Sequence, residues 1–399
     1  DKNAGAANKT IAVSGATAGA NTSLSNYNVS YTNNTASTIN KANITAISGV
    51  TLSNKVYDGT TNASFNASAA TFTGKVAGDT LTLTGGTGSF ASKNVGNNIN
   101  VSVTNMTLGG ADAGNYNVTG GTPSFNGTAN ITAAAVMITA NAQTKTYDGT
   151  TNVSNTSAYT TTGVVAGESI TASLAYTDKN AGAANKTIAV SGATAGANTS
   201  LSNYNVSYTN NTASTINKAS LTATVNNDAK FVTQTDNTSY SGISYVGFVS
   251  GDNAGTAITG ATISRTNSGI ESAGTYNGVL TASNISSTNY NITVQAGNFT
   301  IVPADQLLVR VTNTNATYGS TPNLTVSSAQ YMNASNVISN LTLSSHSGNS
   351  YSYTDGVGGQ ANFTLSPLNS TASSSGNTIV GAYQLGAANV TTVNATNFN

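Results

Sequence analysis

Short stretches of alternating apolar and polar residues recur along the whole chain. Examples are the segments LTLTG, INVSVT, YNVSYT, NITVQ and NFTIV. A period of two turns one face of each segment inward and the other toward water, which predicts half-buried β-strands. Turns rich in Gly and Asn separate these segments at intervals of roughly 8–12 residues, a spacing typical of β-sandwiches and barrels. The pattern therefore predicts an all-β fold.

The predicted strands are grouped in repeats. Residues 1–42 recur letter for letter at residues 178–219, and the motifs KVYDGTT and KTYDGTT begin at Lys55 and Lys145. Aligning these copies divides the chain into successive units. They are the C-terminal half of a repeat at 1–42, complete repeats at 43–131 and 132–219, a diverged repeat at 220–302, and a degenerate unit lacking its last strand at 303–399.

Only a few residues join one unit to the next, which predicts little independent motion between them. We therefore expect a tandem array of small β-sandwich repeats of the immunoglobulin type that forms an extended rod. The strand pattern leaves β-grasp-like units and a β-solenoid open as alternatives.

Two tyrosine motifs are expected to hold each unit together. In Tyr-Asp-Gly the carboxylate stabilises a turn, the glycine adopts a positive φ and the tyrosine ring is buried. A second tyrosine, as in DAGNY and SAGTY, is similar to the tyrosine corner of immunoglobulin-like domains, where the hydroxyl bonds to upstream backbone. The structural residues predicted in this way are Tyr57, Asp58, Gly59, Tyr147, Asp148, Gly149, Tyr116, Tyr204, Tyr276, Tyr290 and, in the degenerate unit, Tyr383.

Charge and cysteine content narrow the possible partners. Charged residues are 7% of the chain, against roughly 25% in ordinary soluble domains. The 13 basic and 13 acidic residues cancel, so no basic field attracts nucleic acid. Cys is absent, which excludes disulfides and thiolate chemistry, and no apolar run is long enough for a membrane span.

Candidate chemistry is sparse. Asp58 and Asp148 could serve as metal ligands or acids, but the other carboxylates of each repeat are widely spaced, which favours a structural role. The single histidine, His346, lies in a polar, loop-like stretch, with Asp355 as the nearest downstream carboxylate. Many Asn-x-Ser/Thr sequons are present, which makes N-glycans possible, although alternating strands produce such triplets without any glycan. We expect no catalytic residue, no metal and no cofactor.

The segments KVYDGTT, FASKNVG and LGGADAGNYNV, in that order, resemble the YDG repeat of large bacterial exoproteins. The units at 220–302 and 303–399 are similar to the companion MBG-type repeat, whose opening Tyr-Gly corresponds to Tyr318 and Gly319. Such repeats occur in filamentous-haemagglutinin-like adhesins that Gram-negative bacteria export by two-partner secretion.

The resemblance implies a non-enzymatic, extracellular protein at the surface of a Gram-negative bacterium, as the stalk of an adhesin or a biofilm matrix protein. Its expected partners are further repeats or copies of the same chain and, beyond them, a host or neighbouring cell surface or a polysaccharide. The alternative is a self-assembling extracellular fibre or surface-layer subunit joined by pairing of edge strands.

Overall fold

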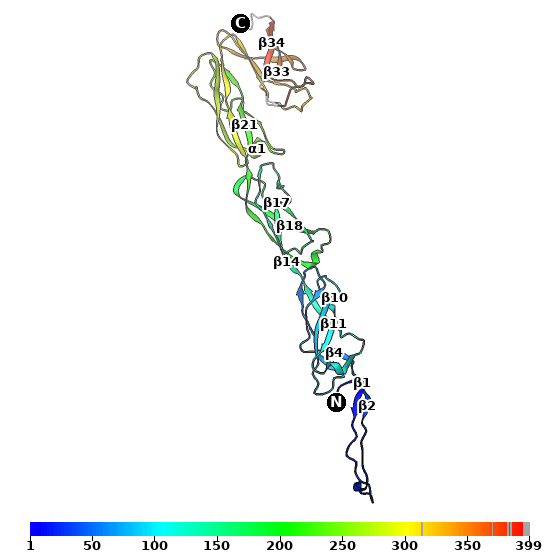
Figure 1. The fold of residues 1–399 in the computed structure, drawn as a ribbon. Helices are drawn as coiled ribbons and strands as arrows, with labels where there is room; N and C mark the ends of the chain where they lie inside the picture. Colours follow the sequence, from blue (N-terminus) through cyan, green and yellow to red (C-terminus); the bar gives the residue numbers. More distant parts are fainter. Residues whose placement is uncertain (313, 369, 381–382, 384, 394–399) are drawn as a thin grey trace. The chain divides into compact units, whose positions relative to one another are not determined.

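The computed structural model describes residues 1–399 except 313, 369, 381–382, 384 and 394–399 (Figure 1). Almost all regular structure in the described residues is β, which confirms the predicted all-β repeat array. The chain forms two compact units. The first comprises residues 1–141, 157–174 and 190–210, and the second comprises residues 142–156, 175–189 and 211–399.

The first compact unit contains the N-terminal half-repeat and the first complete repeat. The half-repeat is a hairpin of β1 (Gly5–Ile11) and β2 (Asn34–Ile39), with the single 3-10 turn η1 (Leu24–Asn26) between them. The elements of the complete repeat are β3 (Ala42–Ile44), β4 (Ala46–Ser48), β5 (Thr51–Leu52), β6 (Lys55–Val56), β7 (Asn62–Ala63), β8 (Phe65–Asn66), β9 (Thr71–Thr73), β10 (Thr82–Phe90), β11 (Gly96–Gly109), η2 (Ala113–Asn115), β12 (Tyr116–Val118) and β13 (Phe125–Thr132).

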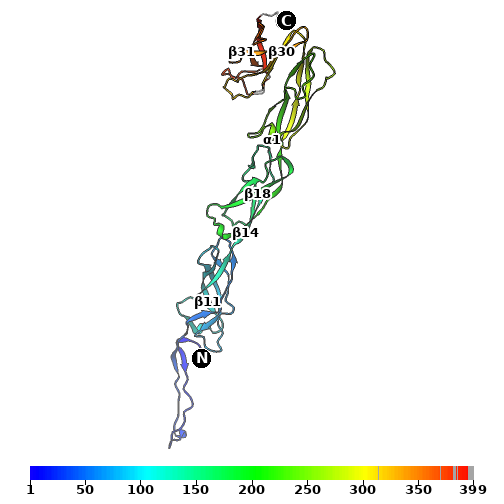
Figure 2. The same cartoon turned by 180° about the vertical axis from the view of Figure 1, so that it is seen from behind.

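The second and third repeats follow one plan. The second consists of β14 (Ala134–Ala140), β15 (Thr144–Thr146), β16 (Tyr159–Thr162), β17 (Ile170–Tyr176), β18 (Gly182–Ala195), η3 (Leu201–Asn203), β19 (Tyr204–Thr209) and β20 (Asn211–Asn217). The third consists of β21 (Ala219–Val225), β22 (Asp228–Phe231), β23 (Ile243–Val246), α1 (Ala254–Ala257), β24 (Thr259–Arg265), β25 (Gly274–Ser286), β26 (Tyr290–Gln295) and β27 (Gly297–Val302). Figure 2 shows α1 at one end of the third repeat.

Parallel pairing ties the beginning of each repeat to its end. In the third repeat, β21 pairs in parallel with β26, and β22 pairs in parallel with β27. The second repeat has the same two pairs, β14 with β19 and β15 with β20, and the first has β3 with β12 and β6 with β13. Alternate residues of these strands point into the core, among them Val136, Ile138 and Leu221. In the second and third repeats, each of two small sheets thus contains one strand from the beginning of the repeat and one from its end.

Residues 1–42 and 178–219 have the same sequence, so differences between them come from the surrounding structure. Residues Gly5, Lys9 and Ile11 of β1 pair with β2 in the same bulged register that β18 and β20 use. Burial, however, differs. Ile11 is 59% exposed, whereas its counterpart Ile188, which the rest of its repeat covers, is 0% exposed. The hairpin geometry is therefore local, and the buried core comes from the neighbouring half.

The last unit departs from this plan. Its strands are β28 (Gln306–Val311), β29 (Val326–Met332), β30 (Ile338–Asn340), β31 (Thr342–Ser347), β32 (Ser350–Thr354), β33 (Gln360–Pro367) and β34 (Leu385–Val393). They form antiparallel neighbours in two sheets, with no parallel pair among the residues described there. Its assignment as a degenerate MBG-like repeat stays a prediction. No helix in the described part of the chain is long and apolar enough to cross a membrane.

Candidate functional site at the joints between repeats

The Tyr-Asp-Gly motif forms a tight turn directly after β6. Asp58 Oδ1 accepts hydrogen bonds from the backbone N and Oγ1 of Thr60, both at 2.9 Å, and from Lys55 Nζ at 2.8 Å. Gly59 adopts φ +76°, which glycine tolerates without a Cβ clash. Burial works to raise the pKa of Asp58, but the hydrogen bonds from Lys55 and Thr60 outweigh it and hold the pKa below its ordinary value.

The second copy of the turn repeats the contacts of the aspartate. Asp148 accepts from Lys145 at 2.7 Å and from the backbone N of Thr150 at 2.9 Å, and Gly149 also has φ +76°. Each aspartate is thus engaged by its own turn and lysine, and the described residues contain no group of His, Cys, Asp and Glu that could hold a metal ion. These contacts favour the structural role for Asp58 and Asp148.

The tyrosine of the motif contacts the following repeat. Tyr57 is buried, and its hydroxyl donates to Glu168 Oε1 at 2.5 Å. Tyr204 donates to the other oxygen, Oε2, at 2.7 Å, and accepts from the backbone N of Val165 at 3.1 Å. The two rings meet edge to face, with centroids 5.5 Å apart. One carboxylate therefore binds tyrosines from two successive repeats.

The next joint repeats this arrangement with a shorter acid. Tyr147 and Tyr290 both donate to Asp252 Oδ2, at 3.0 and 2.6 Å, and their rings meet edge to face at 5.6 Å. The backbone N of Val249 donates to the Tyr290 hydroxyl at 2.8 Å. Burial, followed by the hydrogen bond to the carboxylate, raises the pKa of Tyr57 and that of Tyr290 to about 12.

An asparagine directly before the late tyrosine completes each joint. Its side-chain Oδ1 accepts from a backbone N of the preceding repeat, and its Nδ2 donates to the side chain of an asparagine one residue earlier in that repeat. The three described cases are Asn115 with Ala4 (2.8 Å) and Asn3 (3.2 Å), Asn203 with Val95 (2.9 Å) and Asn94 (3.1 Å), and Asn289 with Ala181 (2.9 Å) and Asn180 (3.0 Å).

These contacts correct two expectations from the sequence. Tyr57 and Tyr147 were expected to anchor their own units, but their hydroxyls reach carboxylates 111 and 105 residues later. A tyrosine corner was expected for the late tyrosines, and the hydroxyl of Tyr116 does bond to upstream backbone, because Val76 N donates to it at 2.9 Å. That contact reaches 40 residues back instead of spanning a tight corner, and the same hydroxyl donates to Asp79 at 2.7 Å. Tyr204 and Tyr290 behave in the same way.

The corner does occur at two other tyrosines. The hydroxyl of Tyr276 donates to the carbonyl oxygen of Ser272 at 2.9 Å, and that of Tyr383 donates to the carbonyl oxygen of Ile379 at 2.6 Å. Each contact spans four residues. The sequence motif SAGTY therefore belongs to a different structural class from DAGNY.

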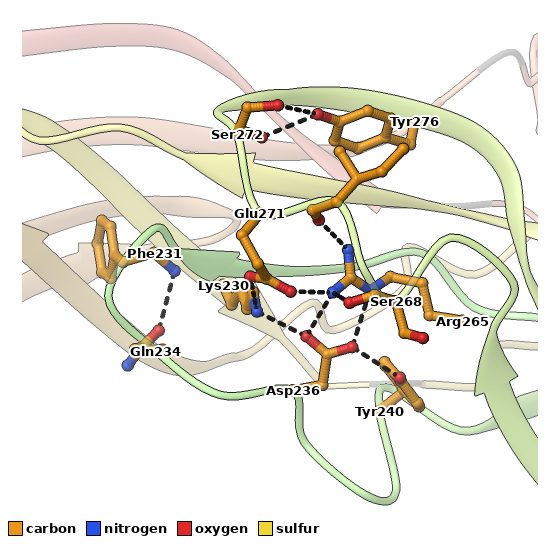
Figure 3. Close-up of polar contacts among 11 residues, drawn as sticks. Lys230, Phe231, Gln234, Asp236, Tyr240, Arg265, Ser268, Glu271, Ser272 and Tyr276 are labelled. Carbon is orange, nitrogen blue, oxygen red and sulfur yellow. Dashed lines mark hydrogen bonds and ion pairs between the residues drawn. The ribbon is translucent and has the colours of Figure 1, made fainter.

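The third repeat replaces the Tyr-Asp-Gly turn with an ion network (Figure 3). The guanidinium of Arg265 has a side-chain exposure of 0%, and its Nε and Nη2 contact the two oxygens of Asp236 at 2.8 and 3.1 Å. Arg265 Nη2 also donates to Glu271 at 2.6 Å. Lys230 contacts Asp236 at 2.8 Å as well as Glu271, so two cations and two carboxylates neutralise each other.

Sequence reasoning found the turn but missed most of the joint. Glu168 and Asp252 each follow a valine by three residues, as Asp79 does, and this spacing was visible in the aligned segments VAGDT and VAGES. The asparagines before the late tyrosines were visible in the same way. His346, expected in a loop, lies instead on β31 and stacks on Tyr351 at 5.6 Å.

The fold and its joints define an all-β repeat array in which successive repeats share side-chain contacts. Comparison with protein families assigns the repeats. Residues 40–124 and 128–215 match the YDG domain, and residues 221–300 match the MBG domain of the YGX type. The chain therefore contains a YDG/MBG repeat region, and such domains are repeat domains of extracellular proteins. Comparisons with curated proteins and with solved structures gave no match.

Proposed function

We propose that this segment is a non-enzymatic spacer, the stalk of a surface adhesin or biofilm matrix protein of a Gram-negative bacterium. The observation that carries the proposal is the recurrence of one joint. A carboxylate bound by two tyrosines connects the first complete repeat to the second and, with Asp252 in place of Glu168, the second to the third. A repeated joint of this kind favours a fixed spacing between repeats, which is the property that a spacer needs.

The chemistry of the described side chains supports the same proposal. The carboxylates of the Tyr-Asp-Gly turns and of the joints are engaged by lysine, tyrosine or backbone groups. Surface charge is sparse, so few ion pairs would be weakened by changes in salt. Neutral Asn, Thr and Ser side chains instead supply the polar surface. Host surfaces, neighbouring cells and polysaccharides are the partners that we propose for the protein that carries this spacer.

Small-angle X-ray scattering of the 399-residue chain over a concentration series tests the proposal. A compact globule of this length has a radius of gyration of about 21 Å. A spacer is expected to give a radius well above that value and independent of concentration. A radius near the compact value would refute the spacer. Growth of particles with concentration would refute it in favour of the alternative, a fibre or surface-layer subunit assembled through edge strands.

A further inference from the structure

Two surfaces make each joint. We call the surface of the preceding repeat the plug. It consists of the tyrosine of Tyr-Asp-Gly and of the asparagine two residues before the start of the long bulged strand, which is β11 in the first repeat and β18 in the second. The socket is the acid three residues after a valine together with the Asn-Tyr pair of the following repeat. In the first joint the plug consists of Tyr57 and Asn94, and its socket consists of Glu168, Asn203 and Tyr204. In the second joint the plug consists of Tyr147 and Asn180, and its socket consists of Asp252, Asn289 and Tyr290.

The third repeat has a socket, yet its strand register shows that it lacks a plug. In the second repeat Lys145 pairs with Ile216, and in the third repeat Lys230 pairs with Ile301 at the equivalent place. Tyr147 lies two residues after Lys145, and the residue two after Lys230 is Val232. Val232 therefore takes the position of Tyr147. The backbone confirms this alignment, because Tyr147 N donates to Asn217 O and Val232 N donates to Val302 O.

The asparagine of the plug is replaced as well. Gly182 and Gly274 begin the long strands and pair with Ile216 and Ile301, which places Ser272 at the position of Asn180. Ser272 is already engaged within its own repeat, since its hydroxyl lies 2.9 Å from the Tyr276 hydroxyl and its carbonyl accepts from it. The hydrogen-bonding groups of the plug are thus absent or used internally.

A different contact joins the third repeat to the unit after it. Arg310 donates to the carbonyl oxygen of Ala229 and lies 3.6 Å from Asp228. Phe231 and Met332, both fully buried, form a cluster with Val302 and Leu308 beside this ion pair. This contact uses apolar packing and an arginine, and it involves neither a tyrosine nor an amide of the plug.

We propose that the MBG repeat is an adaptor that ends a run of YDG repeats. It receives the plug of a YDG repeat through its socket, and it offers the following unit an apolar surface that a YDG socket does not fit. In a YDG repeat placed after it, the half-buried carboxylate equivalent to Glu168 would keep the tyrosine of its own repeat and lose the one from the preceding repeat, and the buried amide equivalent to Asn203 would lose the asparagine that accepts from its Nδ2. Unpaired buried groups of this kind oppose docking.

The proposal is tested by giving the first repeat the two plug residues of the third. Spin labels at Asn100→Cys and Thr160→Cys, both exposed positions, report the distance across the joint, and the absence of native cysteine makes the labelling specific. The full chain is expected to give one narrow distance distribution by pulsed electron paramagnetic resonance. Tyr57→Val with Asn94→Ser is expected to abolish that narrow peak, because a YDG socket then faces MBG-type plug residues.

Two controls keep this result interpretable. Tyr147→Val with Asn180→Ser makes the same change at the next joint and is expected to leave the distance between the two labels unchanged. If the first double variant loses its β-sheet circular dichroism, Tyr57→Phe with Asn94→Ser retains the ring and removes only the side-chain hydrogen bonds that Tyr57 and Asn94 make to the socket. A narrow, unshifted peak in either folded variant of the first joint would overturn the proposal.

Discussion

Two tyrosines in identical sequence surroundings provide a direct test of the joint. Tyr27 and Tyr204 occupy the same position of the stretch that occurs at both 1–42 and 178–219. Tyr204 is 7% exposed, donates to Glu168 and accepts from Val165, whereas Tyr27 is 64% exposed. Replacing each by phenylalanine removes one hydroxyl and leaves local strand propensity nearly unchanged.

The expected cost follows from the hydrogen bonds lost. Tyr204→Phe removes a hydrogen bond to a charged acceptor, which contributes about 1.5–3 kcal/mol to stability. The edge-to-face contact with the Tyr57 ring is retained, so no cavity adds to this value. Tyr27→Phe is a surface change and is expected to stay within about 0.5 kcal/mol of the wild-type chain.

Hydrogen exchange followed by mass spectrometry measures both effects by segment. Tyr204→Phe is expected to speed exchange in β19 and also in the turn that contains Tyr57, because the two share Glu168. Tyr27→Phe is expected to leave both segments unchanged. Equal effects of the two variants, or a change at Tyr204 that stayed within its own repeat, would refute a stabilising role for the joint.

Three further predictions concern single groups. Tyrosine has a pKa near 10 in the unfolded chain, whereas Tyr57 and Tyr290 have a pKa of about 12 in the folded chain. Their contribution to the free energy of unfolding is therefore complete below about pH 10 and is lost as the pH rises through 12. Absorbance at 295 nm should show these two tyrosines ionising last. Gly149→Ala is expected to cost ~1–2 kcal/mol in urea denaturation, because φ is +76° and the new Cβ would lie 3.2 Å from Val249 Cγ1. Arg265→Met leaves the carboxylates of its network under-compensated and is expected to cost ~3–5 kcal/mol in the same assay, whereas an unchanged midpoint would contradict the role of the network.

Local chemistry was predictable from the sequence because it depends on few residues. The turn at Asp58 and Gly59 needs only a short acceptor side chain and a residue that tolerates positive φ, and both are adjacent in the motif. Alternation of apolar and polar residues likewise indicated the strands. The partner of Tyr57 was not predictable in the same way, because Glu168 lies 111 residues later and only the order of the repeats brings the two together.

The ion network of the third repeat gave no sequence signal. Lys230 is on β22 and Arg265 is on β24, while Asp236 and Glu271 lie in separate loops, so no spacing or period relates the four residues. The network became recognisable only through register, which places Lys230 at the position of Lys55 and Lys145. In the YDG turn the lysine forms an ion pair with one aspartate. In the third repeat the equivalent lysine contacts two carboxylates, and the buried Arg265 supplies the second positive charge that neutralises them.

The boundaries of the sequence repeats differ from those of the compact units. The second repeat, residues 132–219, contributes residues 132–141, 157–174 and 190–210 to one unit and its remaining residues to the other. This division follows from the joints, because a socket at one end of a repeat and a plug at the other bind different neighbours. The half-repeat shows the complementary point, since β1 and β2 keep their register without the residues that bury Ile188 in the copy. Each hairpin therefore holds its own geometry, while burial is supplied by what packs beside it. Stability in such an array is a sum of terms within each repeat and terms between neighbouring repeats, and the tyrosine–carboxylate joint contributes hydrogen bonds to the terms between neighbours.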